Sequence, residues 1–161
     1  MTTELTDADR AAFAAAPQPS WNNSATVARA LEQLAQCTEA DLNNVCSAML
    51  YAVGNNHCGS YFPVALLVIP HIGKLLVGTS QPVRRATLEV LVDMLSFDPD
   101  PDHEYVERPT GNVKLRGLVW DAIEALRPSF ETLRTSDDPA TFQLVADILE
   151  MIAERNEPPV M

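Results

Sequence analysis

The stretch VIPHIGKLLVGTSQPVRRATLEVLVDML, residues 68–95, carries the pattern that decides the fold. An apolar run containing Pro70 leads into a short polar turn. Pro82 then opens a long segment whose apolar residues recur three and four positions apart. This spacing is typical of an amphipathic helix, and proline suits a first helical turn because its missing N–H has no partner there. The stretch therefore predicts two helices joined by a tight turn.

The first of these two helices has two possible forms. The residues from Tyr61 to Val77 read as buried helix, but a proline inside a helix removes a hydrogen bond and crowds the preceding turn. Either the helix kinks at Pro70, or a short helix ends there and a new one begins with Pro70 at its first position.

Helical patterns continue on both sides of this stretch. They cover residues 6–16, 23–36, 42–53, 115–126, 128–133 and 138–155. Glycine is sparse, with six residues, and the helix formers alanine and leucine are abundant. We therefore predict a single all-α domain over residues 1–161 with about seven to eight helices, in which residues 1–22 form an N-terminal helix and connector.

A later stretch repeats the organisation of the first. Residues 125–133, ALRPSFETL, are followed by a short loop, Asp138-Pro139 and another long amphipathic segment. Pro70 pairs with Pro128 at an offset of 58 residues, and Pro82 pairs with Pro139 at an offset of 57. One helical hairpin cannot bury its apolar face alone, so the repetition predicts stacked hairpins that share a core.

The repeated unit resembles the HEAT family of helical repeats. Its order is an apolar pair before Pro70, a Leu-Leu pair, a polar turn and Pro-Val-Arg-Arg-Ala from Pro82, which is similar to the junction between two HEAT repeats. The segment NHCGSY, residues 56–61, also resembles a pattern of bacterial HEAT-like proteins. The resemblance covers about residues 38–155 and implies a HEAT/armadillo-like α-α superhelix. It departs from a regular array at residues 97–112 and in the extra N-terminal helices.

The charge of the chain narrows its possible partners. Its 22 acidic residues outnumber its 11 Lys and Arg residues, which gives a formal net charge of −11. Binding to nucleic acid or to anionic lipid depends on Lys and Arg, so neither partner is favoured. A basic protein is the natural complement, because opposite charges speed encounter. The alternative is that the charge serves only solubility.

The cysteines and the N-terminus indicate the compartment. Cys37, Cys46 and Cys58 show neither a C-x-x-C spacing nor the even number of a disulfide framework, and Cys46 falls on an apolar helical stripe. The chain has no secretory signal at its start and no run of 18 apolar residues. We expect a cytoplasmic protein without a metal or another cofactor.

Residues 97–112 are predicted to form one long irregular loop, long enough to suggest a role. Its carboxylates are Asp98, Asp100, Asp102, Glu104 and Glu107. An EF-hand needs glycine at its sixth position and glutamate at its twelfth, where His103 and Pro109 stand, so a calcium loop is not indicated. The segment is either a solvated acidic loop stiffened by proline or a surface whose carboxylates meet Lys or Arg of a partner.

Trp120 has two interpretations, and Arg85 is expected to form one contact. Trp120 lies off the main stripe of its predicted helix, so it either packs on a neighbouring hairpin or serves as an exposed anchor for a partner. We include it among the candidate partner-binding residues. Arg85 stands four residues before Glu89, and the pair is expected to form a surface contact within one helix.

These observations favour a protein–protein binding module over an enzyme, since none of the common catalytic or nucleotide-binding motifs occurs. By analogy with small acidic helical proteins of bacteria, the concrete hypothesis is an immunity protein that neutralises a basic toxin domain. One alternative is an enzyme or small-ligand protein with a pocket near His57, Cys58 and Tyr61. Another is a structural scaffold or a regulatory subunit.

Overall fold

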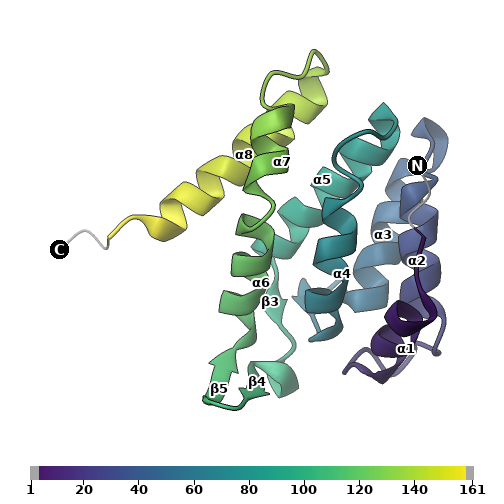
Figure 1. The fold of residues 1–161 in the computed structure, drawn as a ribbon, viewed down its shortest axis with the longest axis vertical. Coiled ribbons are helices and arrows are strands. Elements are labelled where there is room, and N and C mark those ends of the chain that lie inside the picture. Colours follow the sequence, from purple (N-terminus) through teal and green to yellow (C-terminus); the bar gives the residue numbers. More distant parts are fainter. Residues whose placement is uncertain (1–3, 159–161) are drawn as a thin grey trace.

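The computed structural model describes residues 4–158 and consists mainly of α-helices (Figure 1). The helices are α1 Asp7–Ala15, α2 Thr26–Ala35, α3 Leu42–Val53, α4 Val64–Gly73, α5 Gln81–Ser96, α6 Leu115–Glu124, α7 Arg127–Leu133 and α8 Pro139–Asn156. Two short 3-10 helices, η1 Glu39–Asp41 and η2 Pro101–His103, and several short strands lie between them. The mainly helical fold is thus confirmed, although the described chain is not purely helical.

The helices lie in two layers. In one layer α5 packs between α3 and α8, and in the other α4 packs between α1 and α6. Helix α2 contacts α3, α4 and α5, and α7 packs on α8. Figure 1 shows the helices following one another across the molecule, from α2 and α3 on one side to α7 and α8 on the other. The core therefore runs along the whole row of helices.

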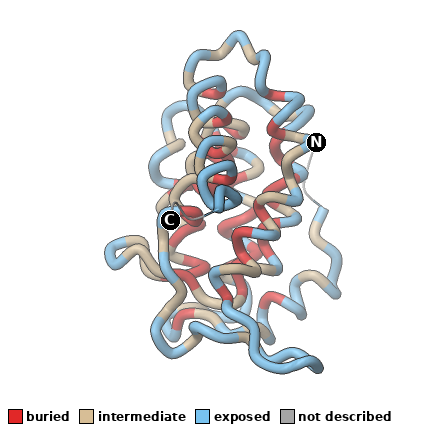
Figure 2. Tube along the Cα trace, turned by 90° about the vertical axis from the view of Figure 1, so that its left-hand side faces the viewer, coloured by how far each residue is buried: buried red, intermediate tan, exposed pale blue. Residues whose placement is uncertain are grey.

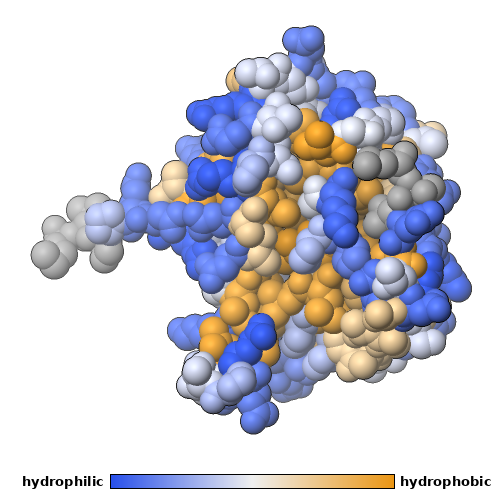
Figure 3. Space-filling view, viewed as in Figure 1, coloured by the Kyte–Doolittle hydropathy of each residue, from blue (hydrophilic) through white to orange (hydrophobic). Residues whose placement is uncertain are grey.

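The buried residues follow this arrangement. Figure 2 shows them along the inward sides of the helices, with exposed residues on the outer sides and in the connections. Helix α5 contributes most, since eight of its sixteen residues are buried. On the face shown in Figure 3, apolar residues also gather over the middle of the molecule, within a hydrophilic surround. Each helix is thus placed by an apolar stripe that its neighbours cover.

Several helix starts are set by local hydrogen bonds. The Thr6 hydroxyl accepts from the backbone N–H of Asp9, whose carboxylate accepts from the N–H of Thr6, and this capping box begins α1. Thr38 and Asp41 form the same reciprocal pair ahead of α3. These caps confirm the starts expected from the sequence.

The repeated prolines are not structurally equivalent. Pro70 lies inside α4, which runs to Gly73, so a new helix does not begin at Pro70. Pro128 instead lies in the first turn of α7, which a short break separates from α6. Pro82 and Pro139 do match, because each lies in the first turn of a long helix. The expected repeat therefore holds for α5 and α8 but not for the helix before each of them.

Residues 97–112 are not one irregular loop, and that expectation is corrected. Strand β3, Asp98–Pro99, pairs in parallel with β2, Ser60–Tyr61, which pairs in antiparallel fashion with β1, Gly54–Asn55. Strands β4, Tyr105–Arg108, and β5, Gly111–Lys114, form a separate hairpin. The pairing of β3 joins segments far apart in the sequence, which local pattern cannot indicate. Tyr61 accordingly lies in a strand, and α4 begins only at Val64.

The three cysteines differ in accessibility, and this predicts a simple chemical result. Cys37 and Cys46 are buried, which raises their pKa to about 11 and about 12, whereas Cys58 is exposed. We expect one fast-reacting thiol with Ellman's reagent at pH 8, because reaction needs an accessible thiolate. Cys58→Ser should remove this fast phase, and all three thiols should react in denaturant. Two fast thiols in the folded protein would contradict the buried placement.

Candidate partner-binding surface

Asp98 ties the acidic segment to the helical body. Its backbone N–H donates to the Gly59 carbonyl at 3.0 Å within the β2–β3 pairing. Its carboxylate lies 2.5 Å from Arg116 Nη1 of α6, and the same guanidinium donates to the Phe97 carbonyl at 3.2 Å. The carboxylate thus closes the junction between the end of α5 and the start of α6.

Asp100 also serves the local structure. Its backbone N–H donates to the Tyr61 carbonyl at 2.8 Å. Its Oδ1 accepts from the N–H of Asp102 at 3.0 Å and lies 3.1 Å from Nδ1 of His103. The His103 ring packs on Phe62, with 5.0 Å between ring centroids. Asp98 and Asp100 therefore hold the segment in place through contacts within the chain.

The other three predicted carboxylates, unlike those of Asp98 and Asp100, have no cationic partner among the described residues. Asp102, Glu104 and Glu107 are exposed, and within residues 4–158 none of them has a Lys, Arg or His partner. Glu107 lies on the same face of β4 as Tyr105, because side chains alternate along a strand, and the Tyr105 side chain is 53% exposed. We call Asp102, Glu104 and Glu107 the acidic edge. It presents unneutralised charge on a backbone ordered by hydrogen bonds.

Trp120 is not an exposed anchor in this structure. It is only 8% exposed, and the guanidinium carbons of Arg116 and Arg155 lie 5.9 and 5.5 Å from the centre of its ring. Such contacts are attractive because the cation meets the negative face of the ring. The exposed tryptophan is Trp21, whose indole N–H donates to the Tyr51 carbonyl at 3.1 Å.

Trp120 instead lies at the bottom of a groove of about 460 Å³ between α6 and α8. We call it the Trp120 groove. Its lining residues are Lys114, Arg116, Gly117, Trp120, Met151, Glu154 and Arg155. A second groove, of about 400 Å³, lies against it and shares Lys114 and Arg116. The second groove is also lined by Asp98, Pro99, Pro101, Glu104 and Tyr105. Lys114 and Arg116 were not predicted as site residues, although both stand next to the acidic segment.

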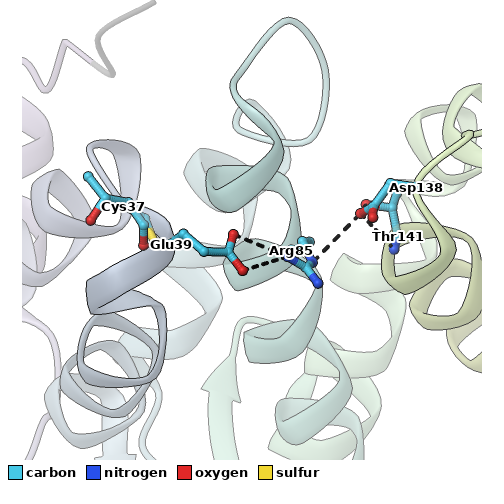
Figure 4. Close-up of polar contacts among 6 residues, drawn as sticks. Cys37, Glu39, Arg85, Asp138 and Thr141 are labelled. Carbon is cyan, nitrogen blue, oxygen red and sulfur yellow. Dashed lines mark hydrogen bonds and ion pairs between the residues drawn. The ribbon is translucent and has the colours of Figure 1, made fainter.

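Arg85 pairs with other partners than the one expected. Its guanidinium bonds both carboxylate oxygens of Glu39, at 2.9 and 3.1 Å, and its Nε lies 3.7 Å from Asp138 (Figure 4). Asp138 also caps α8 by accepting from the N–H and hydroxyl of Thr141, and these bonds lower its pKa. The expected contact with Glu89 on the same helix is therefore replaced.

This arginine joins η1, α5 and α8, and Figure 1 shows the starts of α5 and α8 at the end of the molecule opposite the β4–β5 hairpin. Its role is structural, because both its acidic partners belong to the chain. Glu89 itself is half-buried, and burial together with the nearby charge of Asp93 raises its pKa.

His57, Cys58 and Tyr61 do not line a common pocket. His57 and Cys58 are exposed in a turn whose backbone N–H groups donate to the side chain of Asn55. Tyr61 is 0% exposed, and burial raises its pKa to about 12. A catalytic site needs its groups within reach of one substrate, and the buried phenol is out of reach of solvent.

Among residues 4–158 no three His, Cys, Asp or Glu side chains gather where they could hold a metal ion. None of the helices in that range combines the length and apolar character that a membrane crossing requires.

No protein-family model matches the chain, and no curated protein or solved structure is significantly similar to it. Its function is therefore argued from its own residues.

Proposed function

We propose that this chain is a protein-binding module built of helical hairpins stacked in the HEAT-repeat manner, and that it acts by binding rather than by catalysis. The side-by-side packing of α3, α5 and α8 supports this arrangement. So do the first-turn prolines Pro82 and Pro139 of the two long helices. A row of hairpins exposes long continuous sides, which suit the binding of another protein.

The acidic edge is the observation that carries the proposal. Its three carboxylates have no cation partner in residues 4–158, while Asp98 and Asp100 are already engaged. An ordered backbone reduces the entropy lost when a partner is bound. The net charge of −11 extends the attraction for a basic protein beyond contact distance. The partner that fits this surface is a protein with exposed Lys and Arg.

The most concrete form of the proposal is an immunity protein of the cytoplasm. In this form the acidic edge covers a cationic active site of a toxin domain, and charge complementarity supplies both rapid encounter and specificity. A scaffold or a regulatory subunit would use the same surface with other partners. The two forms differ in their number of partners and in whether binding stops a toxic activity.

The test compares two variants of equal charge. Asp102→Asn/Glu104→Gln/Glu107→Gln removes the acidic edge, and Asp137→Asn/Glu150→Gln/Glu157→Gln removes three exposed carboxylates elsewhere. At about 0.5 kcal/mol for each exposed ion pair, loss of the edge should weaken binding of a basic partner by about tenfold. The partner is captured from the native host with the wild-type chain, and affinity is measured at low salt. Both variants should melt like the wild type.

Several outcomes decide between the forms of the proposal. A single stoichiometric basic partner that is toxic when expressed alone and harmless when co-expressed supports an immunity protein. Several unrelated partners support a scaffold. Equal weakening by the two triple variants would assign the effect to net charge and would overturn the acidic edge as the contact surface.

A further inference from the structure

We infer that the Trp120 groove is a second binding site, and that it takes a peptide segment of another protein that carries a carboxylate next to an apolar side chain. Its lining has more cationic than acidic side chains, unlike the acidic edge. It involves none of Asp102, Glu104 and Glu107 and does not depend on the function proposed above.

The groove concentrates positive charge in an acidic chain. Three of the 11 Lys and Arg residues line it, namely Lys114, Arg116 and Arg155, against one carboxylate, Glu154. Lys114 is exposed and has no ion-pair partner within residues 4–158, so its ammonium can meet an incoming carboxylate. Lys114 also belongs to the neighbouring groove, which places it at the boundary of the two.

The two arginines are held in position before any ligand arrives. The Arg116 guanidinium pairs with Asp98 at 2.5 Å, and the Arg155 guanidinium pairs with Asp121 at 2.9 Å and with Glu124 at 3.6 Å. Both lie over the Trp120 ring. A guanidinium has five N–H donors, so these contacts leave each arginine with donors for a further carboxylate. Prior fixation reduces the ordering cost of binding.

The rest of the lining explains why the ligand also needs an apolar part. Trp120 and Met151 provide apolar surface. The buried indole N–H of Trp120 has no acceptor among the described residues, so one hydrogen-bond donor beside the groove is left unpaired. A peptide that places an acidic residue beside a leucine matches both properties.

Negative charge around the groove favours a ligand with few carboxylates over a polyanion. Asp98, Glu104 and Glu154 stand at the two grooves, and the chain as a whole is strongly negative. A polyanion such as a nucleic acid would meet repulsion along most of its length. A peptide can cross from the Trp120 groove into the neighbouring groove, where Tyr105, Pro99 and Pro101 offer further apolar contact.

The test uses Trp120 as its own reporter. The chain has two tryptophans, so Trp21→Phe leaves Trp120 as the single fluorophore. The probe is the acetylated and amidated hexapeptide Gly-Glu-Leu-Glu-Leu-Gly, and its control has both glutamates replaced by glutamine. We expect a saturable change in Trp120 emission with the glutamate peptide and about fivefold weaker binding of the glutamine peptide, because two exposed ion pairs of about 0.5 kcal/mol each are lost.

The chain supplies a matched pair of lysine variants. Lys114 and Lys74 are its only lysines. Lys114→Gln should weaken binding by about twofold, the effect of one exposed ion pair, and Lys74→Gln should not change it. In a second readout, the glutamate peptide should protect Lys114 but not Lys74 from acetylation, measured by mass spectrometry.

Four results would overturn the inference. They are the absence of saturable binding, equal binding of the glutamine peptide, equal effects of Lys114→Gln and Lys74→Gln, and glutarate binding as tightly as the peptide. The triple variant of the acidic edge should bind the glutamate peptide at least as well as the wild type, since nearby repulsion falls. Loss of peptide binding in that variant would also count against a separate site.

Discussion

Gly54→Ala should lower the melting temperature by about 10 °C, one of two large stability effects that the structure predicts. A Cβ atom at this position would lie 1.9 Å from the carbonyl oxygen of Ser60 and 2.7 Å from the Cα of Tyr61. Both are backbone atoms of the paired strand β2, so no side-chain rotation can relieve the contact. The cost comes from this close approach and not from backbone strain, because φ of Gly54 is −174°, an extended value that any residue adopts.

The magnitude follows from the cost of excess atoms in a packed region. Overpacking costs about 1–3 kcal/mol and occasionally more, and contact with backbone places Gly54→Ala at the upper end. In a domain of this size each kcal/mol lowers the melting temperature by about 2–4 °C. Thermal unfolding followed by circular dichroism measures the change.

Gly117→Ala is the matched control for this substitution. A Cβ built at Gly117, in the first turn of α6, would meet no heavy atom within 4 Å beyond its chain neighbours and the backbone of its own helix. Alanine is favoured over glycine in a helix interior by about 1 kcal/mol, so this variant should melt at or above the wild-type temperature. If Gly54→Ala melted like Gly117→Ala, the close β1–β2 pairing would be wrong.

Gly54→Ala also bears on the candidate surface. Strand β2 is the partner of both β1 and β3, and β3 carries Asp98. Displacing β2 therefore disturbs the anchor of the acidic segment. We expect the variant to bind a basic partner more weakly at temperatures where its helices remain folded, because the acidic edge loses its fixed position.

Leu91→Ala is the second large effect, with an expected loss of about 3 kcal/mol in the free energy of unfolding, within the range for large-to-small changes in a core. Leu91 is fully buried in α5, the helix that packs between α3 and α8. Removing its side chain leaves a cavity in the core around α5. Urea unfolding at equilibrium measures the loss, and an unchanged m-value would show that the unfolded surface is the same.

Leu67→Ala is the control for Leu91→Ala. Leu67 is 39% exposed on α4, so its truncation removes less buried surface and should cost about 1 kcal/mol or less. A loss for Leu91→Ala no greater than that for Leu67→Ala would contradict the central place of α5 in the core.

The predicted helices were confirmed where the signal was local. The spacing of apolar residues over 42–53 and 81–96 indicated α3 and α5, and the Thr6 and Thr38 caps are formed by residues three positions away. The helix around Pro70 could be narrowed to two forms only. In the structure, α4 continues through Pro70 and packs between α1 and α6.

The candidate site was predicted in part. The five acidic residues were identified, but a sequence does not show that Asp98 and Asp100 have partners within the chain while the other three do not. The spacing of nearby residues also did not indicate which tryptophan is exposed. Trp120 is covered by Arg155 from a distant helix, whereas Trp21 remains exposed. Lys114 is one of only two lysines and follows the acidic segment, and this position in the sequence is the signal that could have indicated it.

The sequence by itself determined the helical character, the acidic charge and the helix starts, because these depend on residues within one or two turns of each other or on composition alone. Only the tertiary structure decided the strands and the ion pairs between distant residues. β2 meets β3 across the chain, and Arg85 joins Glu39 to Asp138. Such contacts form when helix packing brings distant segments together, and no local spacing encodes which carboxylate then lies beside which arginine. The same packing gives Asp98 and Asp100 partners within the chain, leaves the acidic edge without them, and forms the Trp120 groove.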